Sequence, residues 1–305
     1  MQEVELANSQ TISTATRLPV SVIVAARNEE KNLPRCLEAL REAGEVYVID
    51  SQSTDATPAI AGSFGAKVVQ FCYQGGWPKK RQWAMNNLPL EYDWILLVDA
   101  DEALTPKLGD EIRRAIENPA FSGYYISLRM HFLGRVLRHG DASFWKLALF
   151  RRGKGRYECR LKEQDRSMAD MEVHEHVVVE GATSRLKNPL IHHNMESLSR
   201  YIQKHDEYSN WEASVLLEGE QNSSDLPPAL LGTQAQRRRW LKKKLYALPG
   251  SPVLLFFYRY FLRLGFLDGV PGLIYCGFQA VQMFHTKSKI YEMKTRLQVA
   301  GQKGN

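Results

Sequence analysis

Cysteine is scarce in this 305-residue chain and is spread widely along it. The four cysteines form no CxxC pair and are Cys36, Cys72, Cys159 and Cys276. This spacing argues against a zinc site and against a small fold held by disulfides. Cysteines used in this way are typical of a reducing compartment, so we expect the protein to work in the cytoplasm.

Two common phosphate-binding motifs are also missing. A strand predicted at residues 20–26 leads into Arg27-Asn28-Glu29-Glu30, where a dinucleotide-binding enzyme would carry the glycine-rich turn GxGxxG. A P-loop of the form GxxxxGKS or GxxxxGKT occurs nowhere in the chain. These absences weigh against dinucleotide oxidoreductases and P-loop ATPases.

Long apolar runs are absent as well. A transmembrane helix needs about 20 consecutive apolar residues. The most apolar part of the chain, residues 253–284, is interrupted by Arg259, Arg263 and Asp268. The N-terminus carries Glu3 and Glu5 and lacks the basic and then apolar pattern of a secretory signal. We therefore expect neither a bilayer-spanning helix nor a secretory leader.

What the sequence does contain is a predicted buried strand that ends in three carboxylates. Residues 94–98 are all apolar and are followed by Asp99-Ala100-Asp101-Glu102. Parallel sheets bind their ligands beyond the carboxyl ends of the strands. Carboxylate oxygens gathered there suit Mg²⁺ or Mn²⁺ holding a phosphate. Taken alone, the same residues also fit a solvated acidic turn.

Three strand–helix units precede this strand, and they predict an α/β fold. The expected strands are residues 20–26, 46–50 and 67–71, with helices beginning near Asn28, Thr57 and Lys79. Such units require right-handed crossovers and a parallel sheet. Later elements suggest a mixed or antiparallel half, with a helix at 106–118, strands at 124–130, 145–150 and 171–180, and a helix at 198–217.

We expect the chain to divide into three parts. These are a flexible lead at residues 1–17, an α/β domain at 18–220 with halves meeting near residue 105, and a C-terminal helical region at 229–305. The net charge is only +6, from 40 basic and 34 acidic residues, so strongly basic character has to come from clustering.

The clearest basic cluster lies at residues 236–245, which read Gln-Arg-Arg-Arg-Trp-Leu-Lys-Lys-Lys-Leu. Apolar helices follow it directly. This combination favours helices that lie in a membrane interface, with the cluster facing anionic headgroups. The alternative is a helical pack against the α/β domain, with the cluster as a solvated face.

The ordered set of loops resembles the family 2 glycosyltransferases, which are inverting enzymes with the GT-A fold, a Rossmann-like fold for nucleotide-diphospho-sugar transfer. The likeness rests on Ala25 to Glu30, Ile49 to Asp55 and Asp99 to Glu102, and it runs from about residue 18 to 180. The block from Gly265 to Gly272 is similar to the bacterial branch that contains lipopolysaccharide core β-1,4-glucosyltransferases and exopolysaccharide enzymes.

The resemblance implies a divalent cation, Mg²⁺ or Mn²⁺, and a nucleotide-sugar donor. Asp101 would bind the metal directly, and Asp99 would hold the metal through water or the ribose of the donor. Asp50 would bond the pyrimidine base of the donor. The residues placed around the base and ribose are Ala25, Arg27 and Glu29. Lys79 and Arg81 would lie near the diphosphate, unless they form a solvated basic face.

Inverting transfer also needs a carboxylate that takes the proton of the attacking acceptor hydroxyl. The resemblance identifies Glu175, within Val173-His174-Glu175-His176, as this base, although the family's more familiar pattern here is Glu-Asp. His174, or else His176, would complete the metal shell. A surface strand of polar residues is the alternative. His192 and His193 are expected to be structural, with a second-site role left open.

These observations predict a metal-dependent inverting glycosyltransferase. It would move a hexose from a UDP-sugar to a lipid-linked, lipopolysaccharide or exopolysaccharide acceptor, and it would be peripheral to the inner membrane through residues 236–285. A nucleotidyltransferase is the first alternative, although the usual glycine-rich loop after the first strand is missing. A basic protein without catalysis is the second. Because apolar helices adjoin the basic cluster, lipid suits it better than nucleic acid.

Overall fold

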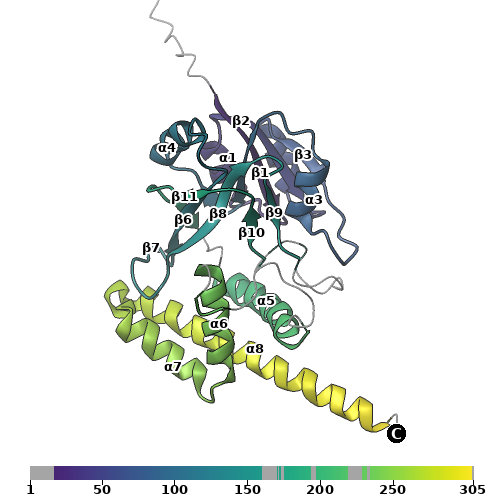
Figure 1. Cartoon of the computed structure of the whole chain (residues 1–305), viewed down its shortest axis with the longest axis vertical. Coiled ribbons are helices and arrows are strands. Elements are labelled where there is room, and N and C mark those ends of the chain that lie inside the picture. The colour runs from purple at the N-terminus through teal and green to yellow at the C-terminus, as the bar shows by residue number, and fades with distance from the viewer. Residues whose placement is uncertain are drawn as a thin grey trace, which may run out of the picture.

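A ten-stranded mixed sheet forms the centre of the protein (Figure 1). The computed structural model describes residues 17–159, 170, 172, 175–193, 197–218, 229–231 and 234–303. The strands of the sheet are β1 (Leu18–Ala26), β2 (Ala43–Asp50), β3 (Lys67–Gln70), β4 (Trp94–Asp99), β5 (Glu102–Ala103), β6 (Gly123–Phe132), β7 (Arg135–Val136), β8 (Phe144–Arg151), β11 (Thr183–Arg185) and β12 (Leu190–His193).

The order of the strands confirms the predicted α/β plan. It runs β3-β2-β1-β4-β8-β6-β12-β5, and β7 and β11 pair with β6 outside this path. The pairs β2–β3, β1–β2 and β1–β4 are parallel, as the three strand–helix units require. Beyond them, β8 runs antiparallel to both β4 and β6, so the second half of the sheet is mixed.

Helices cover both faces of the parallel half. On one face lie α1 (Leu33–Ala39), α2 (Thr57–Ser63) and α4 (Pro106–Ile116), which bury alternate β1 residues such as Val22 and Val24. On the other face lie α3 (Lys80–Asn87) and a hairpin of β9 (Gly155–Tyr157) with β10 (Val177–Val179), which bury Ile23 and Leu97. Burial on two faces explains why these strands read as continuous apolar runs.

Three local expectations were wrong. The position of Gly44 after the first predicted helix suggests that it ends this helix, but Gly44 lies inside β2, where a Cβ atom would lie 2.3 Å from the ring of Tyr92. Asn28 does not cap a helix: it has a φ of 53°, and its side chain accepts the N–H of Thr54 at 2.9 Å. Within the part of 171–180 that the structure describes, only β10 is a strand, because Glu172 and Glu175 turn toward α3 instead of pairing in a ladder.

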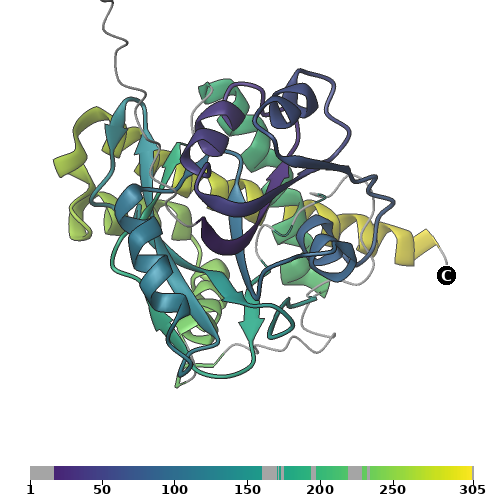
Figure 2. The same ribbon diagram turned by 90° about the horizontal axis from the view of Figure 1, so that it is seen from above.

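The C-terminal helices form a second layer below the sheet domain (Figure 1). They are α5 (Leu198–Glu218), α6 (Gln234–Ala247), α7 (Ser251–Phe257) and α8 (Gly269–Lys303), with a π-helical turn at η1 (Tyr258–Leu262) and a 3-10 turn at η2 (Gly265–Asp268). Figure 2 looks down on the sheet domain and shows green α5 and yellow α8 behind it. Residues 1–16 of the predicted lead and residues 219–228, before the predicted C-terminal region, fall outside the described residues.

Asp268 joins this layer to the sheet domain. Its buried carboxylate accepts the backbone N–H groups of Arg138 and His139, which follow β7, at 2.9 and 2.8 Å. Gly265 and Gly272 allow a close turn of the chain beside Asp268. A Cβ atom on Gly272 would lie 2.1 Å from the carbonyl oxygen of Gly265. The block from Gly265 to Gly272 therefore forms a joint between the two layers.

Asp268→Ala is expected to lower the free energy of unfolding by about 2 kcal/mol, because two backbone N–H groups lose a charged, buried acceptor. Chemical unfolding followed by circular dichroism measures the loss. Glu292→Ala is the matched control, since Glu292 forms an exposed ion pair with Arg296 on α8, and such pairs contribute less than about 1 kcal/mol. Equal losses in the two variants would contradict the role given to Asp268.

Candidate functional site

The predicted site residues gather at the carboxyl ends of β1 and β4. The strand order reverses there, because β2 and β3 lie on one side of β1 and β4 lies on the other. Open α/β sheets bind their ligands at such a switch point. Ala25 pairs in register with Asp99, so the loop after β1 lies against the carboxylates after β4.

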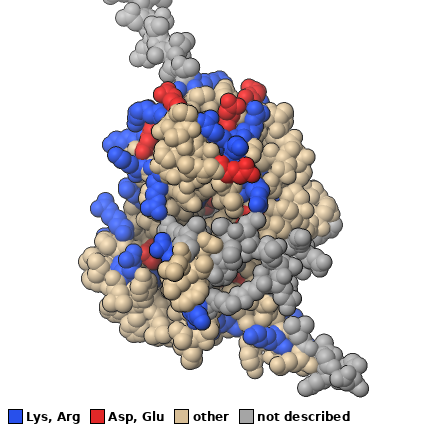
Figure 3. Space-filling model, in the orientation of Figure 1, with Lys and Arg blue, Asp and Glu red and all other residues tan. Residues whose placement is uncertain are grey.

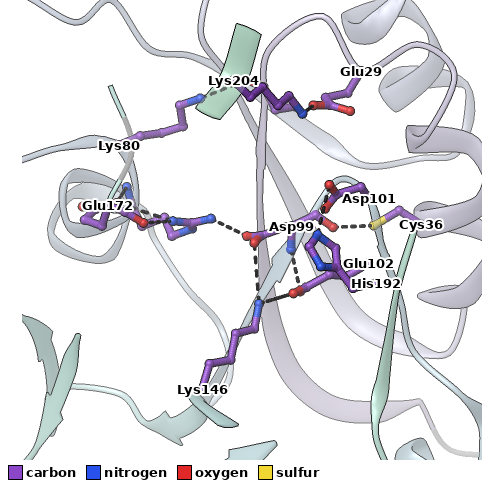
Figure 4. A network of polar contacts seen from close by, with 12 residues as sticks. Glu29, Cys36, Lys80, Asp99, Asp101, Glu102, Lys146, Glu172, His192 and Lys204 are labelled. Atoms are coloured by element: carbon purple, nitrogen blue, oxygen red, sulfur yellow. Dashed lines mark hydrogen bonds and ion pairs between the residues drawn. The ribbon is translucent and has the colours of Figure 1, made fainter. Parts of the chain in front are cut away.

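Asp99 is held by two cations. The guanidinium of Arg81, from α3, bonds one carboxylate oxygen, and the ammonium of Lys146, from β8, lies 3.8 Å from the other (Figure 4). Burial opposes ionisation of Asp99, but the charges of Arg81, Lys146 and His192 outweigh it and lower the pKa of the carboxyl group. Asp99 is therefore an anion already matched by positive charge.

Asp101 faces a different partner, His192 at the end of β12. The Nε2 atom of His192 lies 3.2 Å from Oδ2 of Asp101, and the carbonyl oxygen of Asp101 accepts the N–H of His193 at 2.8 Å. Burial alone would lower the pKa of His192, but the negative charges of Asp101, Glu102 and Asp99 raise it to about 9. The imidazolium thus serves as the counter-ion of Asp101.

Glu102 orders the loop that carries both aspartates. Its buried carboxylate accepts the backbone N–H of Asp99 at 2.9 Å and two contacts from the Lys146 ammonium, at 2.6 and 2.5 Å. Its backbone pairs with His192 across the β5–β12 ladder. The short strand β5 therefore places His192 beside the carboxylates.

Asp101 and His192 could hold a divalent cation once the imidazolium has lost its proton, because a histidine binds a metal only in its neutral form. Two ligands on adjacent corners of an octahedron with bonds of about 2.1 Å lie about 3 Å apart, and these two atoms are 3.2 Å apart. Carboxylate oxygen suits Mg²⁺ and Mn²⁺, while imidazole nitrogen favours a transition metal, so such a pair would suit Mn²⁺ better than Mg²⁺. No group of three or more His, Cys, Asp or Glu side chains in the described part of the chain is arranged to hold a metal.

The predicted base, Glu175, lies beside α3. Its carboxylate is buried, and Oε1 lies 3.2 Å from the equally buried ammonium of Lys79. Lys79 also lies over the ring of Trp211, from α5, at 5.3 Å. The structure therefore brings together two residues that were predicted to act separately. His174, the predicted third metal ligand, lies outside the described residues.

Glu172 ties the same segment to the start of α3. Its carboxylate accepts the backbone N–H groups of Arg81 and Gln82 at 3.1 and 2.9 Å, and its carbonyl oxygen accepts the Arg81 guanidinium at 2.7 Å. A carboxylate at a helix N-terminus is favourable because the free N–H groups there carry partial positive charge. Arg81 thus connects Glu172 with Asp99.

The two donor loops that the sequence predicts are built around Asp50 and Glu29. The buried Asp50 carboxylate bonds the side chain and backbone of Ser53 and accepts Gln70 Nε2 at 2.9 Å. Glu29 is also buried, and its two oxygens accept Asn32 Nδ2 at 2.8 Å and Lys204 Nζ at 3.0 Å. Ala25 is buried beside Asp99, whereas Arg27 is exposed.

Several residues of the site were not predicted from the sequence. They are Lys146, Glu172, Lys204 and Tyr208. His192 is a further member of the site, although the sequence favoured a structural role for it. Only for the α5 residues does the sequence contain a pattern that could have indicated a shared position, because Lys204, Tyr208 and Trp211 recur at the spacing of one helix face. That spacing also fits an ordinary buried stripe.

A Rossmann-like parallel half, a mixed second half and paired aspartates at the switch point together define a transferase of the GT-A fold class. A family model for Glycosyl transferase family 2 matches residues 21–173, which is half of the chain, and the protein belongs to this family. It is therefore a glycosyltransferase.

Sequence relatives extend the likeness beyond the family segment. The lipopolysaccharide core biosynthesis glycosyltransferase LpsC of Rhizobium meliloti (strain 1021) is 26% identical over 283 residues, which cover 90% of this chain and 93% of LpsC. An uncharacterized glycosyltransferase of Rickettsia conorii is 24% identical over 84% of this chain and 83% of its own. Among solved structures, S. aureus TarS 1-349 in complex with UDP-GlcNAc covers 90% of this chain and 91% of its own, at 18% identity and a TM-score of 0.41.

Proposed function

We propose that this glycosyltransferase moves a hexose, with inversion, from a UDP-sugar to a lipid-linked or lipopolysaccharide-type acceptor. The observation that carries the proposal is the Asp101–His192 pair at the switch point between β1 and β4. A divalent cation held there would stabilise the departing diphosphate as a Lewis acid. Two protein ligands leave coordination positions for water and phosphate oxygens, which is a usual arrangement for such cations.

The side chains around this pair have complementary roles. Ser53 and Gln70 fix the carboxylate of Asp50, which then presents its remaining lone pairs to the uracil ring. Arg81 and Lys146, which match the charge of Asp99, place two cations where the diphosphate gathers negative charge. Such charges help most when they are already oriented before the reaction.

Glu175 remains our candidate for the base. In this role its carboxylate takes the proton of the acceptor hydroxyl as that oxygen attacks the anomeric carbon. The ion pair with Lys79 would hold the carboxylate in one orientation, and the ring of Trp211 would exclude water from the pair. In these contacts Glu175 lies beside Lys79, the residue that precedes α3.

Two observations support the acceptor class. LpsC, whose alignment covers 90% of this chain at 26% identity, is named for lipopolysaccharide core biosynthesis. In addition, large apolar side chains stand exposed on α7, η1, η2 and the start of α8, where the surface in Figure 3 is mostly uncharged. Exposed apolar area of this extent is typical of an interaction site. It supports an acceptor that is anchored in a membrane.

Among the helices that the structure describes, none is long and apolar enough to cross a bilayer. Contact with a membrane would therefore be interfacial, through residues 236–285 at the cytoplasmic face. Here the exposed cations of α6, including Arg237 and Lys244, would face anionic headgroups. The packing of α8 on α5 and the joint at Asp268 leave the apolar side chains of η1 exposed.

A charge on these apolar side chains is expected to weaken membrane binding. Leu262 and Val270 are 76% and 68% exposed, so Leu262→Asp with Val270→Asp should lower partition into anionic vesicles about tenfold or more. Vesicle flotation measures it. Tyr291→Asp, a change at a 75% exposed site on the far half of α8, is the control. Equal binding by all three proteins would contradict interfacial contact through η1 and α8.

The proposed reaction is tested by a donor screen. The protein would be incubated with a panel of sugar nucleotides, Mn²⁺ and membrane lipid extract, and release of nucleoside diphosphate would be recorded. We expect UDP release from one UDP-sugar and sugar incorporation into lipid. Release of pyrophosphate from a nucleoside triphosphate, without UDP release from any sugar nucleotide, would replace the proposal with nucleotidyl transfer.

A further inference from the structure

One face of α5 reaches into the site. Lys204, Tyr208 and Trp211 recur at i, i+4 and i+7, and so share this face. The Lys204 ammonium bonds Glu29 of the β1 loop at 3.0 Å, and Trp211 lies against Lys79. The opposite face of the helix contacts α8, as the ion pair of Asp206 with Lys289 at 2.6 Å shows.

Lys204 lies beside the carboxylate cluster, on the side away from Lys146. In Figure 4 the Lys204–Glu29 pair lies above Asp101, and Lys146 lies below the cluster. Burial would lower the pKa of Lys204, but the charges of Glu29 and Asp101 raise it, so the ammonium is fully charged.

We infer that Lys204 binds the donor: its ammonium turns from Glu29 to the diphosphate of the nucleotide sugar. This inference rests on the proposed function. Glu29 keeps a second partner, Asn32, so its carboxylate stays in place when the ammonium turns toward a phosphate. The Lys204 side chain is 24% exposed, which leaves the ammonium accessible to an entering anion.

Binding of UDP and UMP to substituted proteins separates this role from a merely structural one. Lys204→Met keeps the length of the side chain and removes its charge. In the presence of Mn²⁺, we expect it to raise the Kd of UDP by about 10- to 100-fold, the effect of losing one charged hydrogen bond. The Kd of UMP should rise by much less, because UMP lacks the second phosphate. Lys204→Arg should recover most of the affinity for UDP.

Arg200→Met is the control, because Arg200 lies one turn earlier on α5 and bonds Gln203 at the surface. An unchanged affinity for UDP in Lys204→Met would overturn the inference. So would equal losses for UDP and UMP, since they would mean that Lys204 only positions the loop. If the unsubstituted protein binds UDP and turns over a sugar nucleotide, either result removes the role of Lys204 and leaves the proposed function standing. If it does neither, the proposed function itself fails.

Discussion

Asp101→Asn is expected to lower the rate of sugar transfer by about a thousandfold or more. The substitution removes the charged oxygen that faces His192 at 3.2 Å and that would bind the cation. Lewis-acid stabilisation of a leaving diphosphate amounts to several kcal/mol, and each 1.36 kcal/mol corresponds to about tenfold in rate. Steady-state UDP release at saturating Mn²⁺ measures the effect.

The control for this substitution lies at the opposite end of the same strand. Asp93 precedes β4 and is exposed, and its carboxylate lies 3.6 Å from Arg152. Asp93→Asn should leave the rate within about twofold of the unsubstituted protein, since exposed ion pairs contribute little. A rate for Asp101→Asn above a tenth of the unsubstituted value would show that Asp101 is not the metal anchor.

Glu175→Gln is expected to have the second-largest effect, a fall in kcat of about 10²- to 10⁴-fold, which is the usual contribution of a positioned general base. Glutamine has the same shape and can still bond Lys79, so the affinity for UDP should not change. Parallel measurements of kcat and of UDP binding distinguish a lost base from a disturbed donor site.

Glu180→Gln is the matched control for Glu175. Glu180 follows β10, is exposed, and lies 3.7 Å from Lys154. This variant should retain full activity. A kcat for Glu175→Gln equal to that of Glu180→Gln would mean that another carboxylate takes the acceptor proton, and the buried pair with Lys79 would then be only structural.

The parallel half of the fold could be predicted because its information is local. The apolar runs of β1, β2 and β4 are bounded by turn-forming residues, and a helix pattern follows each of the first two strands. The rule that ligands bind at the carboxyl ends of parallel strands then placed Asp50, Asp99 and Asp101 near one edge of the sheet. In the structure this edge carries the ion pairs around Asp99 and Asp101.

The partners of these aspartates could not be predicted, because they depend on pairing between distant segments. His192 reaches Asp101 only because β12 pairs with β5, which follows the aspartates directly. Lys146 reaches Asp99 because β8 pairs with β4. Nothing in the local periodicity of β8 or β12 specifies these neighbours, so a lysine and a histidine within strands looked like ordinary polar positions.

The C-terminal region illustrates a different limit of sequence patterns. The sequence is compatible with interfacial helices and with helices packed on the domain, and one segment can combine an outer apolar face with a packed inner face. In the structure, Asp268 and α8 fix the region to the sheet domain and to α5, while Leu262 and Val270 point outward. The hydrophobicity of the segment could not separate these roles, because it counts apolar residues without showing which face each one occupies.

The most direct test of the account is a titration of Mn²⁺ followed by electron paramagnetic resonance of the free ion, with and without UDP. We predict about one tightly bound Mn²⁺ per chain when UDP is present, as expected for a cation that takes both protein and phosphate oxygens. Asp101→Asn should abolish this binding, and Asp93→Asn should preserve it. Equal Mn²⁺ binding by the unsubstituted protein and Asp101→Asn would contradict a metal–diphosphate site at the carboxyl ends of β1 and β4.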